Sequence, residues 1–363
     1  MARVVLFVDL DYFFAQVEEV NNPSLKTMPV VVCVFSGRTM DSGVVSSANY
    51  LARRYGVKAG MSIKLAKRLL PQESAVLPVR MSRYVEISRT VMDVLRSFGG
   101  VLRVESIDEA VMDVTRVVGG DFDAAYRLAS DAKRRVFDET GLTCSVGVGP
   151  NWVVAKVAAD VSKPNGLKMV RPEEVTDFLH PLAVKALPGV GSKTEKILSE
   201  MGIKTLGELD ALNYEVLEKV FGTKKALFIH QVVKGVFDEA IVERPPPKQV
   251  SKIITLKRNT RDVDDVMQSL ANVVSQAAAK LESNGYAASK LGLIVITSTI
   301  RTLTRQTEIR PGTGLDETLR ILRRMVEEVF GDDENLYVRR VGVRFSGLQK
   351  LSGQTKLNVF TES

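Results

Sequence analysis

Apolar and polar residues recur along the first half of the chain in two periods, one typical of strands and one typical of helices. The runs at 3–11 and 29–35 are almost continuously apolar, which predicts buried strands, whereas 83–99 and 123–141 carry apolar residues at helical spacing. The same patterns predict helices over 12–20, 46–56, 62–71 and 151–166, a hairpin over 104–114 and a strand over 143–149. Strands and helices therefore alternate to about Gly166, as in an α/β or α+β unit.

The pattern changes twice beyond Gly166. From about Leu167 to Val242 we find only helical patterns separated by Gly and Pro, which predicts a small all-helical domain. Three prolines with flanking charges at 243–252 indicate a semi-rigid connector. The segments after it predict the order β-α-β-β-α-β of a split βαβ unit, at 251–260, 262–283, 290–299, 301–309, 315–331 and 337–348. The expected fold class is therefore α+β with several domains.

Composition narrows the class of protein. The chain has 363 residues, 45% of them hydrophobic, and no apolar run approaches the ~20 residues of a membrane span, so a globular protein without a membrane partner is expected. The first ten residues are interrupted by Asp9 and do not resemble a secretory signal, which favours the cytoplasm. Cys33 and Cys144 lack metal-ligand spacing and are expected to be buried free thiols.

Positive charge is concentrated near the C-terminus. The net charge is +7, and the segment from Arg244 to Lys350 holds 18 Lys and Arg residues against 12 Asp and Glu residues. This segment is therefore a candidate for nucleic-acid binding.

Two adjacent carboxylates, Asp108 and Glu109, interrupt the apolar run "VESIDEAVMDV" at 104–114. One interpretation is that they lie in a solvated hairpin turn, the usual place for charge. In the other, the hairpin adjoins the first strand, so that both lie near Asp9. Three carboxylates in a cleft repel one another unless cations bind, and oxygen ligands without His or Cys favour Mg²⁺. Two such ions could assist an in-line displacement at phosphorus.

Four motifs carry a family resemblance: "VDLDYFFAQVE" at 8–18, "SANYLAR" at 47–53, "SIDEA" at 106–110 and "KVAADVSKPNG" at 156–166. In this order and spacing they resemble the Y-family DNA polymerases, most closely the archaeal DinB branch. The resemblance covers nearly the whole chain and implies a low-fidelity, template-directed translesion DNA polymerase that extends a primer with deoxynucleotides. It also implies these domains: a palm at 1–12 and 80–168, fingers at 13–79, a thumb at 169–242 with a helix-hairpin-helix element, a linker at 243–250, a little finger at 251–349 and a tail at 350–363.

The resemblance also assigns active-site roles. Asp9, Asp108 and Glu109 match the catalytic carboxylates that hold two Mg²⁺, with Leu10 contributing only its main-chain carbonyl. Groups that match the triphosphate-binding residues are Ser47, Tyr50, Arg53 and Lys163, and Tyr12 would offer mainly its backbone. Phe14 matches the aromatic residue that excludes a ribose 2′-hydroxyl. Phe13, its neighbour in the nucleotide-binding segment, is expected to belong to the core, because adjacent helical residues face different ways.

Further residues would contact DNA and a protein partner. In "LPGVGSKTEKIL", Gly189, Gly191 and Lys193 resemble a helix-hairpin-helix contact to a DNA phosphate. Basic candidates on the little finger are Lys252, Lys257, Arg258, Arg301, Arg339, Arg340 and Arg344, and which of them face DNA is left open. In the tail, Gln354, Leu357 and Phe360 have the spacing of a sliding-clamp-binding peptide, although Thr361 stands where relatives often have a second aromatic residue.

The expected partners are therefore primer-template DNA, deoxynucleoside triphosphates and a sliding clamp, with the chain acting as a monomer. No stretch suggests an exonuclease domain, so proofreading is not expected. One alternative is a non-catalytic repair factor that binds DNA and a clamp. Another is a different two-metal enzyme, a nucleotide cyclase or a nuclease, because a fold alone does not fix a reaction.

Overall fold

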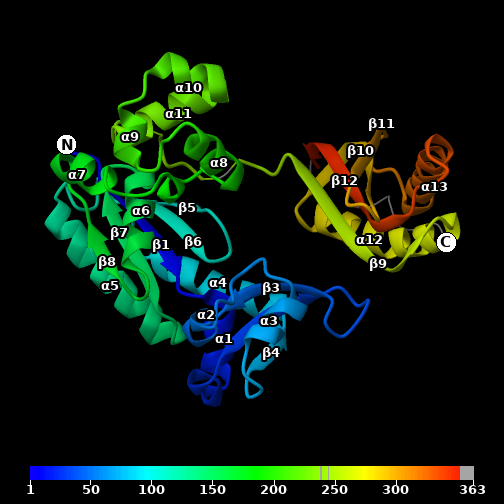
Figure 1. Ribbon diagram of the computed structural model, residues 1–363, viewed down its shortest axis with the longest axis horizontal. Helices are drawn as coiled ribbons and strands as arrows, with labels where there is room; N and C mark the ends of the chain where they lie inside the picture. Colours follow the sequence, from blue (N-terminus) through cyan, green and yellow to red (C-terminus); the bar gives the residue numbers. More distant parts are fainter. Residues whose placement is uncertain (238, 244, 352–363) are drawn as a thin grey trace. The chain divides into compact units, whose positions relative to one another are not determined.

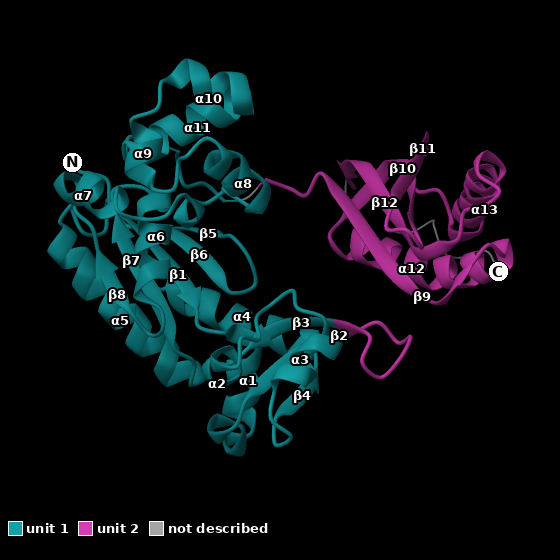
Figure 2. Cartoon of the chain, viewed as in Figure 1, with its two compact units in different colours: residues 1–34, 44–244 teal, residues 35–43, 245–363 magenta. Residues whose placement is uncertain are grey.

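The structure, a computed structural model, describes residues 1–237, 239–243 and 245–351. These residues form two compact units, one made of 1–34 and 44–244 and the other of 35–43 and 245 onward (Figure 2). The division near residue 244 falls in the proline-rich connector. No sequence pattern indicated that 35–43 belongs to the second unit, where Arg38 Nε donates to the main-chain oxygen of Leu256 at 2.6 Å.

The first unit is built around a five-stranded sheet in the order β5-β6-β1-β7-β8 (Figure 1). The strands are β1 (Val5–Leu10), β5 (Val101–Val104), β6 (Glu109–Asp113), β7 (Cys144–Gly149) and β8 (Leu167–Met169). Strand β1 is antiparallel to both β6 and β7, so the predicted hairpin does adjoin the first strand. The prediction that only helices follow Leu167 is wrong at β8, because three residues are too few to show a strand period.

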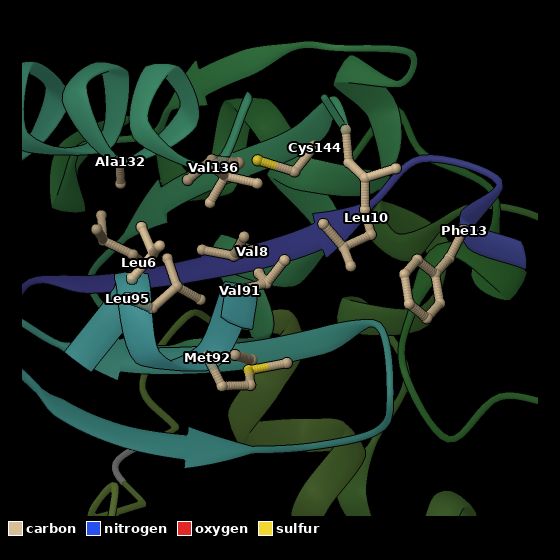
Figure 3. Packing of buried hydrophobic residues seen from close by; sticks show 14 of the residues in the cluster. Leu6, Val8, Leu10, Phe13, Val91, Met92, Leu95, Ala132, Val136 and Cys144 are labelled. Carbon is tan, nitrogen blue, oxygen red and sulfur yellow. The ribbon is translucent and has the colours of Figure 1, made fainter. Parts of the chain in front are cut away.

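Helices cover both faces of this sheet. On one face, Leu6, Val8 and Leu10 of β1 pack with α4 (Met81–Arg96) and α5 (Phe122–Thr140) (Figure 3). On the other, Val5 and Phe7 pack against α6 (Trp152–Ser162). Side chains alternate along a strand, so the next residue on the α6 face is Asp9.

A smaller three-stranded sheet, in the order β3-β2-β4, lies in the segment that the family resemblance assigns to the fingers. Its strands are β2 (Val30–Phe35), β3 (Gly43–Ala48) and β4 (Ala75–Pro78), and its neighbours along the chain are α1 (Phe13–Asn21), η1 (Pro23–Thr27), α2 (Tyr50–Arg54) and α3 (Ile63–Leu69). The predicted helix over 46–56 is wrong in its first part. Asn49 caps α2 by accepting from the Ala52 N–H at 2.9 Å, so the helix begins only after it.

The chain beyond β8 is helical, as predicted. A short 3-10 helix, η2 (Pro172–Glu174), comes first. The helices after it share one core with α6: α7 (Val175–Leu179), η3 (Val184–Ala186), α8 (Ser192–Glu200), α9 (Leu206–Asp210), α10 (Tyr214–Phe221) and α11 (Thr223–Val233).

The second unit confirms the predicted order β-α-β-β-α-β. Its elements are β9 (Gln249–Thr260), α12 (Val263–Ser283), β10 (Tyr286–Thr297), β11 (Thr302–Glu308), α13 (Leu315–Asp332) and β12 (Val338–Lys350). They form an antiparallel sheet in the order β11-β10-β12-β9, and α12 and α13 share a core with one of its faces. Cys33 and Cys144 are buried free thiols. Within the described ranges, no helix is long and apolar enough to cross a membrane.

We predict that Gly147→Ala destabilises the first unit by at least about 3 kcal/mol, because α6 crosses β7 at this glycine. A Cβ there would lie 1.8 Å from the carbonyl oxygen of Ala155, which the backbone of α6 cannot vacate. Thermal unfolding followed by circular dichroism measures the effect. Gly331→Ala, near the end of α13 where a Cβ meets nothing within 4 Å, is the control and should change stability by less than about 1 kcal/mol. Equal melting of both variants would contradict this packing.

Candidate active site

The pairing of β1 with β6 brings the predicted carboxylates together. Asp9 lies directly opposite Glu109, and the Leu10 N–H donates to the main-chain oxygen of Asp108 at 2.9 Å. Residues directly opposite each other in an antiparallel pair project from the same face, so Asp9 and Glu109 both lie on the α6 face. The acidic pair at 108–109 is therefore not an isolated solvated turn, because it adjoins the end of the first strand.

Two lysines neutralise these carboxylates. Lys156, on α6, places its Nζ 2.5 Å from Glu109 Oε1 and 4.3 Å from the centre of the Phe7 ring. Lys163 follows the end of α6 and binds Asp9 at 2.5 Å, with Asp160 also 3.1 Å away. Lys163 was predicted from its motif, whereas Lys156 was not singled out. The position of Lys156, one helical turn after Trp152, did not indicate a role in the site.

Burial dominates the electrostatics of Asp9, whose side chain is only 6% exposed. Desolvation raises the pKa of this carboxyl to about 7, although the charge of Lys163 and its hydrogen bond oppose the rise. For Lys163 burial is the largest single influence and lowers the pKa, but the charges and hydrogen bonds of Asp9 and Asp160 together outweigh it, so the net shift is upward. Both pKa values are raised, so the folded protein favours the protonated form of each group. When Asp9 is charged, it needs a cation beside it.

The oxygen donors on this face fit a hard divalent cation. Asp9 and Glu109 offer carboxylates in register, and Asp108 is half-buried and accepts from Ser106 Oγ at 2.5 Å. In the part of the chain that the structure describes, no three His, Cys, Asp or Glu side chains converge closely enough to form a complete metal site. Lys163 and Lys156 form ion pairs with Asp9 and Glu109. A bound metal would therefore take the place of the two lysine ammonium groups. The donor set is carboxylate oxygen alone, which favours Mg²⁺ over zinc.

The predicted triphosphate-binding residues lie around one aromatic cluster. Tyr12 and Tyr50 meet edge to face at 5.0 Å, and the Arg53 guanidinium lies 4.9 Å from the Tyr50 ring centre. Ser47 Oγ donates to the main-chain oxygen of Tyr12 at 3.0 Å. The buried Tyr50 hydroxyl has no hydrogen-bond partner among the described residues, and burial raises its pKa, followed by the charge of Asp11. It therefore remains a neutral donor with capacity for an acceptor, which phosphate oxygens supply.

Asp11 acts differently from Asp9. Its buried carboxylate accepts from Thr143 Oγ1 at 2.8 Å, from Ser145 Oγ at 2.8 Å and from the Asn165 N–H at 2.9 Å. These bonds fix the turn after α6 that carries Lys163. Asp11 was not among the predicted site residues, because its structural role depends on partners more than 130 residues away.

An aromatic stack lies beneath the predicted sugar-discriminating residue. The rings of Phe14 and Tyr84 are parallel within 14°, with centres 4.3 Å apart. Tyr84 is fully buried and donates its hydroxyl to Glu18 Oε1 at 2.6 Å, and Arg80 Nε donates to the same carboxylate at 3.0 Å. Phe13 is buried in the core, as predicted from helical geometry. Tyr84 was missed because α4 shows only an ordinary amphipathic pattern there, and Glu18 of α1 was not singled out within its motif.

The backbone is accessible just before α8, where Gly189, Gly191 and Lys193 are predicted to contact a DNA phosphate. Gly189 has a left-handed φ of 87°, which favours glycine, and a Cβ added at Gly191 would meet nothing within 4 Å. Lys193 is exposed on the first turn of the helix, and Lys225 Nζ donates to Thr194 Oγ1 at 2.6 Å, so α11 also begins beside this point. A role in phosphate binding remains a prediction.

The sheet register separates the basic residues of the second unit. Arg340 and Arg344 lie opposite Thr255 and Ser251, on the face away from the helices, because the alternating residues of β12 enter the core. Lys252 lies on the helix side, where its Nζ binds Gln276.

Of the other basic candidates, Arg258 pairs with Asp265 of α12 at 2.9 Å, and Lys257 and Arg301 are exposed. Arg339 is half-buried. We therefore retain Arg340 and Arg344 as the basic residues most directly on the open face. Gln354, Leu357 and Phe360 lie outside the described residues.

Family models match three segments of the chain. Residues 8–160 match the impB/mucB/samB family, residues 247–358 match its C-terminal domain, and residues 185–236 match a domain described as "DNA polymerase-iota, thumb domain". Together these segments span most of the sequence.

Similar proteins extend the match to full length. DNA polymerase IV of Metallosphaera sedula is 39% identical over 96% of this chain and 98% of its own, and that of Nitrosopumilus maritimus is 35% identical over 99% of both chains. Among solved structures, a Y-family DNA polymerase chimera of Dbh and Dpo4 has a TM-score of 0.89 at 37% identity, covering 95% of this chain and 99% of that one. An insertion ternary complex of Dbh DNA polymerase has a TM-score of 0.69 at 37% identity, covering 96% of this chain and 100% of that one.

The α+β fold with its helical thumb and C-terminal antiparallel sheet, together with these matches, defines an error-prone, DNA-directed DNA polymerase of translesion synthesis. The chain belongs to the Y family of DNA polymerases, among the archaeal polymerase IV proteins, as its motifs had indicated. Polymerases of this family use a divalent metal ion.

The raised pKa of Asp9 predicts how Mg²⁺ binding depends on pH. Unfolded Asp9 loses its proton near 3.8 but the folded residue near 7, so the stability contributed by the protonated form is lost as the pH rises through this window. Mg²⁺ must displace that proton at low pH. We expect the rise in Tm caused by Mg²⁺ to grow from about pH 5.5 to about pH 8 and then level off.

Thermal shift assays across this range at constant ionic strength measure the effect. Asp138→Asn, which changes an exposed carboxylate on α5, should keep the wild-type profile, and Asp9→Asn should lose it. A Mg²⁺-induced shift in Tm that is already complete at low pH would contradict the prediction.

The stack beneath Phe14 predicts a loss of sugar discrimination in Tyr84→Leu. This change keeps apolar bulk but removes the ring that holds Phe14 in place, so the ratio of kcat/KM for deoxynucleotides over ribonucleotides should fall about tenfold. Tyr84→Phe keeps the stack and should retain most of the ratio. Tyr126→Leu, at a partly exposed tyrosine on α5, is the control. An unchanged ratio in a folded Tyr84→Leu protein would show that Phe14 is held without Tyr84.

Proposed function

We propose that this chain, acting as a monomer in the cytoplasm, extends the primer strand of primer-template DNA with deoxynucleoside triphosphates, using two Mg²⁺ held by Asp9, Asp108, Glu109 and the Leu10 carbonyl. The observation that carries the assignment is the antiparallel register that sets Asp9 opposite Glu109, with Asp108 at the adjoining turn. Strand geometry thus sets Asp9 opposite Glu109, which lies a hundred positions later in the sequence, with Asp108 next to it.

When bound, Mg²⁺ would activate the primer 3′-hydroxyl and stabilise negative charge on the entering and leaving oxygens. The chain supplies the carboxylates that position it, and the burial of Asp9 strengthens every charge interaction there. Lys163 and Lys156 hold Asp9 and Glu109 in place before the metal arrives. Once released from Asp9, Lys163 has its charge free for the triphosphate.

The triphosphate would lie against the cluster around Tyr50. The unsatisfied Tyr50 hydroxyl can donate a hydrogen bond, and the Ser47 hydroxyl can do so once it turns away from the main-chain oxygen of Tyr12. Arg53 and Lys163 would offset the charge that grows as pyrophosphate leaves. Phe14, backed by Tyr84, closes the space that a ribose 2′-hydroxyl would need. The preferred substrates are therefore deoxynucleotides.

Primer-template DNA would be held through its phosphates. The open backbone at Gly189 and Gly191 with Lys193 supports contact by the thumb, and Arg340 and Arg344 support contact by the little finger. Such contacts do not read sequence, which suits a polymerase that must accept damaged templates. We propose the palm, fingers, thumb and little-finger boundaries given above, and a sliding clamp as partner of residues 354–360.

Asp108→Asn is predicted to lower primer extension at least about a thousandfold while DNA affinity is retained, because it removes a metal-binding charge and keeps the size of the side chain. Extension of a labelled primer with each deoxynucleotide and Mg²⁺ measures the rate, and fluorescence anisotropy measures DNA binding. Asp138→Asn is the matched control and should extend normally.

Other outcomes would replace the proposal. Normal extension by Asp108→Asn would remove this carboxylate from catalysis. No extension by the wild-type chain, with DNA bound, would support the non-catalytic repair factor. Shortening of the primer would indicate a nuclease, and conversion of free triphosphate without DNA would indicate a cyclase.

A further inference from the structure

A cavity of about 600 Å³ lies in the second unit, and none of the residues that line it belongs to the candidate active site. Its walls come from the C-terminal half of α12, the start of β10, the end of β12 and the segment that joins β11 to α13. The lining is largely apolar and includes Val274, Ala278, Leu281, Ile309, Leu315 and Phe345. No Asp, His or Cys contributes to it, so the cavity suits an apolar occupant and not a metal or a reacting group.

The described chain ends at the wall of this cavity. Leu351, the last described residue, lines it, and its N–H donates to the main-chain oxygen of Gly285 at 2.8 Å. Twelve further residues follow, with Leu357, Val359 and Phe360 as their large apolar side chains. Leu357 lies six positions after Leu351, and six positions of extended chain span about 20 Å. These side chains can therefore reach any part of the cavity.

We propose that the tail of the same chain docks in this cavity, with Leu357 and Phe360 filling it. Leu315 at the cavity is 41% exposed, and an apolar occupant would remove such surface from water. Charge also matches: Glu282 and Lys350 line the cavity, and the tail carries Lys356 and Glu362 on either side of its apolar residues. The short tether gives the tail a millimolar effective concentration, so even weak docking is populated.

This docking has a regulatory consequence that rests on the proposed clamp-binding role of the tail. Leu357 and Phe360 cannot fill the cavity and a clamp pocket at the same time. The docked tail is therefore an autoinhibitory contact: it lowers clamp affinity by the fraction of time that the tail spends in the cavity. A clamp that binds must first displace the tail from the little finger.

Hydrogen exchange of the full chain tests the docking itself. We expect amides of residues 309–315 to exchange at least about threefold faster in the double variant Leu357→Asp, Phe360→Asp than in the wild type. The control is Asn358→Asp, Thr361→Asp, which adds the same charges at neighbouring polar positions and should leave exchange unchanged. Equal exchange in all three proteins overturns the proposal. So does protection that disappears on dilution, because the occupant would then be the tail of a second copy.

A second pair of variants separates docking from clamp binding. Ala278→Trp fills the cavity, and Asn272→Trp places the same residue on α12 outside its lining. A labelled peptide of residues 352–363 should bind the chain truncated after Leu351, which keeps every described element, and lose about tenfold in affinity with Ala278→Trp only. Clamp affinity of the full chain should rise with Ala278→Trp.

The outcomes distinguish the two claims. Peptide binding without any clamp affinity would remove the clamp role and leave the docking intact. The opposite result is that the wild type and Ala278→Trp bind the clamp equally well and the peptide does not bind the cavity. This result would overturn the docking and leave the clamp role intact. Peptide affinity equal in Ala278→Trp and Asn272→Trp would also overturn it, because the peptide would then bind elsewhere.

Discussion

The register between β1 and β6 is the constraint on which the rest of the site depends. In this register Asp9 and Glu109 project from the face that α6 covers, while Leu6, Val8 and Leu10 enter the core beneath α4 and α5. A slip of one residue would turn the carboxylates into that core and the leucines toward the site. Because the burial of one face of β1 fixes this register, the stability of the palm-like sheet and the position of the acidic residues have a common origin.

Holding acidic groups in a buried position needs compensating charge, and α6 supplies it. Lys156 and Lys163 lie at its middle and just beyond its end, and each binds one carboxylate. Asp11 fixes the turn that carries Lys163 by accepting three hydrogen bonds, so the lysine is positioned by the residue that directly follows the strand of Asp9. The site thus exists as a balanced charge network before a metal or a nucleotide enters.

Phe14, the proposed sugar-discriminating residue, is also held by residues from distant parts of the chain. Phe14 lies on Tyr84, and Tyr84 is fixed through Glu18, which also binds Arg80. The stack joins α1, the helix that follows β1, to α4. The proposed sugar-discriminating residue and the palm core therefore share a contact, so a change that loosens the core at Tyr84 is expected to loosen Phe14 as well.

The sequence by itself determined the family, the split βαβ unit, the helical segment and the carboxylate candidates, because apolar periodicity and short motifs are local properties of the chain. It could not show β8 or the strand at 43–48, since short strands carry little periodicity. Only the tertiary structure decided that Lys156 binds Glu109, that Tyr84 supports Phe14 and that Lys252 lies on the helix side of its sheet. These facts depend on strand register and helix packing between distant residues, which no local pattern encodes.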